Sequence, residues 1–245
     1  MSRLRQLRTA LPFGVWIGLV LMSAVRRLTG LPITFSFAQG AEDIIIPYIA
    51  TYVLGMTGPG SYVDIGCNDP VRYSNTFELY LRGWRGLNVD ANQDLVARVS
   101  RTRLEDISIC AGVSDVEREV VFHKAKDDAV STLDEERLVD WKKRFEFSDD
   151  DQETITTRTL TSILDEHWRA DRQIDLLSID VEGHDLQVLK GLDLTKYRPR
   201  IVVIEMHNFE GITESAIYRY LIAEGYRLYF FAVLNAYFID AASTT

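Results

Sequence analysis

Short apolar segments alternate with helix-like segments along most of this chain, and this alternation constrains the fold more than any other feature. Strands are expected at residues 61–65, 86–89, 107–113, 115–123, 154–158, 174–179, 201–206, 226–231 and 236–239. Helices are expected at residues 42–54, 74–81, 91–100, 159–168, 185–191 and 213–223. Strands separated by helices are typical of a mostly parallel α/β sheet with helices on both faces. Only residues 232–235 separate the last two strands, so this pair must form an antiparallel hairpin, because a parallel return needs a crossover.

The charge of the chain is distributed unevenly. The formal net charge is −9 and the sequence pI is about 5.0, which argues against nucleic acid as a partner. Residues 1–30 nevertheless hold five arginines and no acid, a charge of +5 that leaves −14 for the rest. The sequence therefore predicts a basic and apolar N-terminal segment, residues 1–36, followed by one domain at residues 37–245.

An uncharged, mostly apolar run at residues 11–25 lies between two groups of arginines. At about 1.5 Å per residue a helix of this length spans about 22 Å, less than the ~30 Å core of a bilayer. Three interpretations stay open: a helix lying on a membrane surface or a partner protein, an ordinary packed helix, and a short anchor or signal. We expect a cytoplasmic protein. It is either free in the cytoplasm or associated with the inner face of the membrane.

The two cysteines argue against a disulfide. Cys67 and Cys110 follow strands that have one other strand between them, so they would lie about 10 Å apart, twice the strand spacing. A disulfide cannot span that distance, and a reducing compartment fits.

An acidic segment at residues 126–153 contains few apolar residues. It is interpreted as a loop insertion, either solvated or acting as a lid over the carboxyl edge of the sheet.

Acidic and histidine side chains follow two of the expected central strands. Asp180, Glu182 and His184 come after the strand at 174–179, while Glu205 and His207 end the next one. Ligands of open α/β sheets bind at this carboxyl edge, so the five residues are candidate catalytic groups. His184 or His207 is favoured as a general base because imidazole titrates near neutral pH, although each could instead be a hydrogen-bonded strand-end residue. Asp180, Glu205 and His207 could alternatively ligate a divalent metal, but no metal-specific spacing supports this and no metal is predicted.

The first strands of the sheet end in candidate cofactor contacts. Asp64 and Gly66 close the first strand, and Asn68 follows in the same turn. Asp90 ends the second strand, where a carboxylate can accept both hydroxyls of a ribose or simply cap the next helix. Asp106 precedes the third strand and is a weak candidate for contact with an adenine edge. The turn after the first strand lacks the Gly-x-Gly-x-x-Gly pattern, which argues against a nicotinamide dinucleotide.

Several of these motifs resemble the FkbM family of S-adenosylmethionine-dependent methyltransferases. The resemblance runs from about residue 37 to residue 239 and rests on GAEDI at 40–44, VDIG at 63–66, SNT at 74–76, GWRGLNVD at 83–90, STL at 131–133 and SIDVEGHDLQVL at 178–189. The chain departs from the family pattern at Ser178, where many members have lysine, and at residues 67–70, where many have a glycine-rich motif.

The resemblance implies a Rossmann-like class I methyltransferase fold, with seven strands, a reversed last strand and S-adenosylmethionine across the carboxyl edge. Asp64 and Gly66 would shape the methionine end of the cofactor pocket, Asp90 would hold the ribose, and Glu42 would approach the cofactor from the preceding helix. The implied reaction is O-methyl transfer to a hydroxyl of a sugar, a glycan or a small polar metabolite. The alternatives are a nicotinamide-dependent oxidoreductase and a non-catalytic methyltransferase fold that serves as a binding module in a glycan-assembly complex.

Overall fold

The computed structural model describes residue 8, residue 11 and residues 13–31, 34–125, 131–133, 135–145, 147–207 and 209–243. Part of the N-terminal segment and part of the acidic segment, including residues 1–7 and 126–130, lie outside the described residues.

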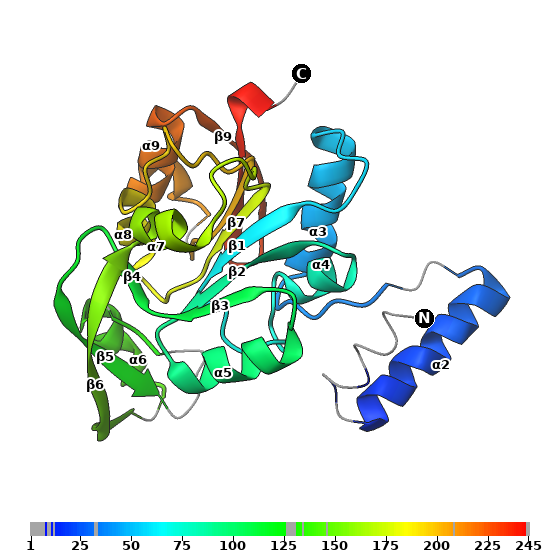
Figure 1. Ribbon diagram of the computed structural model, residues 1–245, viewed down its shortest axis with the longest axis horizontal. Coiled ribbons are helices and arrows are strands. Elements are labelled where there is room, and N and C mark those ends of the chain that lie inside the picture. The colour runs from blue at the N-terminus through cyan, green and yellow to red at the C-terminus, as the bar shows by residue number, and fades with distance from the viewer. Residues whose placement is uncertain are drawn as a thin grey trace.

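A seven-stranded sheet forms the centre of the molecule (Figure 1). Its strands are, in spatial order, β3 (Ile107–Cys110), β2 (Arg85–Asp90), β1 (Ser61–Ile65), β7 (Leu176–Ile179), β8 (Ile201–Glu205), β10 (Asn235–Asp240) and β9 (Tyr226–Ala232). The five strands from β3 to β8 are parallel to their neighbours, whereas β10 is antiparallel to both β8 and β9. The predicted mostly parallel sheet with a reversed last strand is therefore confirmed.

Helices cover both faces of this sheet because successive strand residues point to opposite sides. Tyr62 belongs to an apolar cluster with α3 (Glu42–Tyr48), the π-helical turn η1 (Ile49–Val53) and α4 (Phe77–Leu81). The next residue, Val63, belongs to the cluster on the other face, with α7 (Leu160–His167), α8 (Asp185–Lys190) and α9 (Ala216–Ala223). Helix α5 (Gln93–Thr102) packs along β2 and β3, and the 3₁₀ turns η3 (Ile212–Glu214) and η4 (Ala241–Ser243) complete the chain.

A smaller sheet stands beside the first, with the order β4 (Gly112–Ser114), β6 (Phe147–Thr159) and β5 (Glu119–Ala125). The prediction of one strand at residues 107–113 was wrong, because the chain leaves the large sheet after Cys110 and enters the small one at Gly112. A Cβ on Gly112 would stand 2.7 Å from the side chain of Ile155 on β6, so glycine allows the two strands to approach.

The acidic segment is more regular than a loop. Its described part contains helix α6 (Glu135–Trp141) and the first half of β6. Leu138 of α6 is buried, although the segment has few apolar residues.

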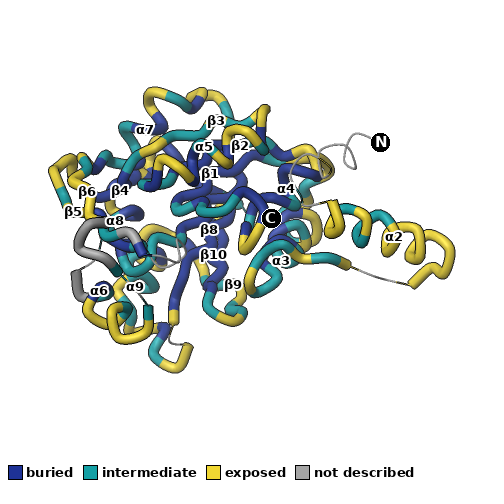
Figure 2. The backbone as a smooth tube through the Cα atoms, turned by 90° about the horizontal axis from the view of Figure 1, so that it is seen from below, coloured by how far each residue is buried: buried dark blue, intermediate teal, exposed yellow. Residues whose placement is uncertain are grey.

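Helix α2 (Phe13–Thr29) lies at the side of the molecule and is drawn mostly as exposed in Figure 2. Leu11, Trp16 and Leu19 make its contact with the body, where they pack against a cluster that includes Phe77 and Tyr80 of α4. No helix among the described residues is long and apolar enough to cross a membrane.

Candidate active site at the carboxyl edge of the sheet

Two adjoining cavities open at the carboxyl ends of the parallel strands. The first has a volume of about 60 Å³ and lies beside β2, β4 and β5, and the second has a volume of about 300 Å³ and lies toward β8. Both are lined by Gly66, Asn68, Asp180 and Glu182. The two cavities therefore lie at the carboxyl edge, where the sequence predicts a ligand site.

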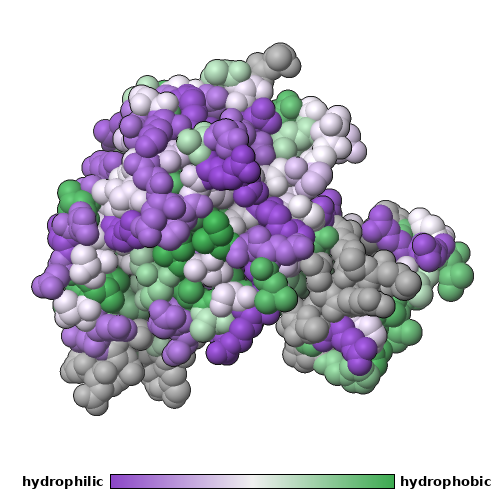
Figure 3. Space-filling model, in the orientation of Figure 1, coloured by the Kyte–Doolittle hydropathy of each residue, from purple (hydrophilic) through white to green (hydrophobic). Residues whose placement is uncertain are grey.

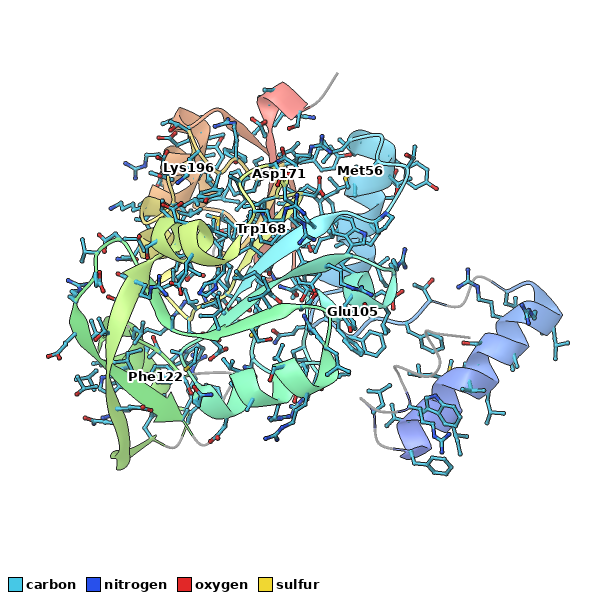
Figure 4. The ribbon with its side chains drawn as sticks, viewed as in Figure 1. Met56, Glu105, Phe122, Trp168, Asp171 and Lys196 are labelled. Atoms are coloured by element: carbon cyan, nitrogen blue, oxygen red, sulfur yellow. The ribbon has the colours of Figure 1, made fainter. Side chains whose placement is uncertain are left out.

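The first cavity combines apolar walls with one carboxylate. Its apolar side chains include Leu95, Val113, Leu133 and Phe122, which comes from β5 and is labelled in Figure 4. Asp90 lies at its edge and accepts the backbone N–H of Asn68 at 2.9 Å and that of Asn92 at 2.8 Å. A carboxylate oxygen can accept more than one hydrogen bond, so Asp90 is a candidate acceptor for hydroxyl groups. An apolar slot with such an acceptor suits a nucleoside.

Gly66 leaves the space in which the two cavities meet. Its φ is +78°, and a Cβ at this position would stand 1.8 Å from the carbonyl oxygen of Asp180. Asn68 also has a left-handed backbone, with φ of 46°. The turn after β1 therefore brings bare backbone to the cavity wall, as expected for a close-fitting cofactor.

Asp64 lines the second cavity, but its carboxylate is already engaged in a buried hydrogen-bond network. The Thr76 hydroxyl donates to Asp64 at 2.5 Å, and the fully buried Arg103 donates to Thr76 at 2.7 Å and to Asn88 at 2.8 Å. Burial raises the pKa of Asp64, and the Arg103 charge opposes this increase. Asp64 therefore holds the loop at residues 74–76 in place and shapes the cavity indirectly.

Three carboxyl groups converge in the second cavity. Asp180, Glu182 and Glu205 each place an oxygen within 4.8 Å of the others. Burial, reinforced by the charge of Glu205, raises the pKa of Asp180 well above its usual range and raises the pKa of Glu182 to about 8. The charge of Arg137 opposes the increase at Glu182, and carboxyl groups with pKa values raised this far hold protons near neutral pH.

A tight turn aims these side chains. Glu182 and Gly183 have φ of 53° and 103°, and Asp185 accepts the backbone N–H of Val181 at 3.3 Å and of Gly183 at 3.0 Å. The Thr132 hydroxyl donates to the Glu182 carbonyl at 2.9 Å. A left-handed non-glycine residue costs energy, so these contacts are what maintain the turn.

The two candidate histidines lie in different environments. His207 lines the second cavity, and its Nε2 lies 3.1 Å from Oε2 of Glu205. His184 is buried behind the turn, where its Nε2 is 2.9 Å from the hydroxyl of Ser114 on β4. The turn at residues 182–183 directs His184 away from the two cavities, and a catalytic role for it stays a prediction.

Two predicted cofactor contacts also lie elsewhere. Glu42 accepts the side-chain amide of Asn235 at 2.9 Å and the backbone N–H of Gly40, so it ties α3 to the β9–β10 hairpin. Asp106 lies at the amino end of β3, where it accepts the Tyr62 hydroxyl and the backbone N–H of Gly86. These carboxylates are used in hydrogen bonds within the fold and line neither cavity, so a cofactor contact by either one stays a prediction.

Helix α6 contributes Arg137, which the sequence did not single out, and Trp141, for which packing and stacking on a substrate are the two interpretations from the sequence. Arg137 Nη2 lies 3.7 Å from Oε2 of Glu205, and its guanidinium lies 5.3 Å from the centre of the Trp141 ring. Trp141 lines the second cavity, and its indole N–H lowers the pKa of Glu182 without reaching the alignment of a full hydrogen bond. The signal in the sequence for a role of α6 at the site is a tryptophan within an acidic segment that has few apolar residues.

The carboxyl groups also form the one described set whose spacing would suit a metal ion. The oxygens of Asp180, Glu182 and Glu205 are close enough to share a divalent cation, which prefers carboxylate ligands. The metal site considered from the sequence had His207 in place of Glu182. In the structure a ring nitrogen of His207 faces Glu205 instead.

A sheet in this order, with a cavity beside the acid that ends β2, is characteristic of methyltransferases that use S-adenosylmethionine. The chain belongs to the FkbM methyltransferase family. The family model described as a methyltransferase FkbM domain matches residues 64–228, which is more than half of the chain. S-adenosylmethionine is therefore its cofactor, and Asp90 and Gly66 lie where they can hold it.

A comparison with curated proteins found no match. Among solved structures, the chain is similar to a TehB-like SAM-dependent methyltransferase from Corynebacterium glutamicum, with a TM-score of 0.42 and 12% identity over 90% of this chain and 96% of the other. It is also similar to a precorrin-6y C5,15-methyltransferase from Geobacter metallireducens, with a TM-score of 0.42 and 10% identity over 86% and 93% of the two chains. The delta-N METTL16 MTase domain has a TM-score of 0.42 and 12% identity over 90% and 92%.

Proposed function

We propose that this protein transfers a methyl group from S-adenosylmethionine to a hydroxyl oxygen of a sugar, a glycan or another small polar metabolite. The observation that carries the proposal is the His207–Glu205 pair in the wall of the second cavity, close to the carboxyl groups that border both cavities. The cofactor supplies a methyl group on a positively charged sulfonium.

His207 is suited to the role of general base. Nε2 of His207 lies 3.1 Å from Oε2 of Glu205 without the alignment of a hydrogen bond. A turn of the ring that lets a neutral imidazole donate Nε2–H to Glu205 would leave a lone pair on Nδ1, which can take the proton of an acceptor hydroxyl. Glu205 then stabilises the imidazolium that forms, as a buried carboxylate does for any catalytic histidine with this pairing.

The lining of the second cavity supports a polar acceptor. Gln39, Arg72 and Asn75 offer hydrogen-bond donors, while Tyr73 and Trp141 offer aromatic surface. Such a mixture fits a ring that has hydroxyl groups at its edge and apolar C–H groups on its face. The volume of about 300 Å³ lies at the lower end for ligand pockets, which favours a small metabolite or one terminal sugar.

Labelled methyl transfer into fractionated host glycans, lipids and small metabolites tests the proposal. We expect label on oxygen, and we expect His207→Gln to lower kcat about 10²–10⁴-fold while the Kd for S-adenosylmethionine stays unchanged. His167→Gln is the matched control, because His167 lies on α7 beside Glu166 and outside the two cavities.

Label on nitrogen or carbon, or an unchanged kcat in His207→Gln, would contradict the proposal. Cofactor binding without transfer to any fraction would support the non-catalytic binding module instead. Binding of a nicotinamide dinucleotide in the same calorimetric titration would support the oxidoreductase.

A further inference from the structure

Helix α2 carries an exposed apolar stripe. Phe13, Ile17, Leu21 and Val25 are spaced four residues apart, and Leu28 follows three residues later, so the five side chains share one face of the helix. Their exposed fractions lie between 37% and 85%. A contiguous exposed stripe of this kind marks an interaction surface.

The contact with the body fixes the direction of the stripe. Trp16 and Leu19 face the body and pack against the cluster formed by Phe77 and its neighbours. The stripe therefore points outward. Figure 3 shows hydrophobic side chains on this helix next to strongly hydrophilic ones.

Positive charge accompanies the stripe. Arg26 and Arg27 lie exposed in the last turn of α2, and residues 1–30 contain no acid. Arg72 and Arg101 line the groove between the start of this helix and the body. The surface around α2 is thus basic, although the chain as a whole is acidic.

We propose that this surface, the apolar stripe of α2 with its flanking arginines, docks on the surface of an anionic phospholipid bilayer. An interfacial helix buries an apolar face among the lipid headgroups while its basic residues contact anionic lipid. Charge complementarity favours the bilayer over a second copy of the chain, because a dimer through this stripe would bring two arginine-rich segments together.

Arg72 connects the surroundings of α2 to the active site. Arg72 lines both the groove under α2 and the second cavity, and Tyr73 beside it is half exposed. The second cavity therefore adjoins the groove on the body side of α2, and the stripe faces away from both.

Co-sedimentation of the full chain with vesicles tests the inference. Vesicles of phosphatidylcholine mixed with phosphatidylglycerol are compared with vesicles of phosphatidylcholine alone. We expect binding to the mixed vesicles, and we expect Leu21→Glu or Leu28→Glu to weaken it at least about tenfold. Ile222→Glu is the matched control, since Ile222 is 40% exposed on α9 and receives the same change in charge.

A second pair of substitutions tests the electrostatic part. The double variant Arg26→Gln/Arg27→Gln should lower the preference for anionic over neutral vesicles about tenfold. Circular dichroism and the affinity for S-adenosylmethionine should be unchanged in every variant, which separates a docking defect from misfolding and from a failure of the catalytic proposal.

Several results would overturn the inference. These are no binding to any vesicle, equal binding by the stripe variants and the Ile222→Glu control, or a concentration-dependent dimer in light scattering that Leu28→Glu abolishes. The last result would assign the stripe to a second copy of the chain.

Discussion

The carbonyl oxygen of Asp180 lies directly against Gly66, so closely that a Cβ on Gly66 would stand 1.8 Å from it. This contact joins the end of β1 to the end of β7, and both residues line both cavities. The packing of two backbone segments therefore sets the width of the active site.

Gly66→Ala should disrupt both the fold and the cofactor pocket. The left-handed backbone costs about 1–2 kcal/mol for a residue with a Cβ, and the clash with Asp180 adds to this cost because backbone atoms cannot rotate away. We expect a loss of about 3 kcal/mol in the free energy of unfolding, measured by urea denaturation, and loss of cofactor binding in calorimetry. Gly58→Ala, which has no neighbour within 4 Å, should change neither quantity.

Asp90→Asn should weaken cofactor binding while the fold remains. The substitution keeps one side-chain oxygen for the backbone N–H groups but removes the charge that would strengthen hydrogen bonds from ribose hydroxyls. We expect the Kd for S-adenosylmethionine to increase about 10–100-fold in calorimetry. Asp94→Asn, on the exposed first turn of α5, is the control, and equal affinities of the two variants would disprove the role of Asp90.

Arg103→Met should be strongly destabilising. The guanidinium donates to Thr76, Asn88 and two further groups with no access to solvent, and its loss leaves Asp64 without a cation in a buried site. Removing one partner of a buried charge network typically costs about 3–5 kcal/mol.

Urea denaturation of Arg103→Met checks this value, with the exposed Arg101→Met as its control. The double variant Arg103→Met/Asp64→Asn should recover part of the loss, because it removes the carboxylate that is left unpaired. If the double variant loses as much as the sum of the two single variants, the proposed pairing is wrong.

The stability of the cofactor-free protein should fall as the pH rises toward 8. The pKa of Glu182 is raised to about 8 and that of Asp185 to about 7, mainly by burial. For an acid with a raised pKa in the folded state, the stabilisation is complete below its unfolded value near 4 and is lost as the pH rises through the folded value. The free energy of unfolding should therefore decrease between about pH 4 and pH 8, by up to about 1.4 kcal/mol per pH unit for each group.

Urea titrations across this pH range measure that slope. Glu182→Gln should make the slope smaller, because the amide does not titrate while Asp185 still does, whereas the exposed Glu117→Gln should leave it unchanged. A wild-type stability that increases from pH 5 to pH 8 would contradict the raised values. The exposed carboxylates with lowered pKa, such as Asp165 and Asp171, change the free energy of unfolding only below about pH 4. They therefore do not contribute to the slope between pH 5 and pH 8.

Most of the large sheet could be predicted from the sequence, because strand spacing and the short connection at residues 233–234 leave few topologies. The small sheet could not. Its strand β4 continues the apolar pattern of β3, and the change of sheet at Gly112 depends on a contact with Ile155 more than 40 residues away. Local periodicity does not contain such information.

The site was only partly predictable for a similar reason. His184 and His207 both follow strands, and the sequence does not reveal that the turn at Glu182 reverses the direction of one of them. Arg103 is one of several arginines around the end of α5, and only its burial distinguishes it. Strand ends predict where ligands bind, whereas the direction of each side chain depends on contacts that are distant in sequence.

The carboxyl groups shared by the two cavities make the site sensitive to the charge of its contents. Asp180 and Glu182 hold protons when both cavities are uncharged, and a positive charge in either cavity favours their ionised forms. Entry of a cation should thus release protons to solvent, and methyl transfer, which turns the sulfonium into a neutral thioether, should draw protons back. The affinity of this protein for a charged ligand is therefore tied to pH, with tighter binding on the alkaline side.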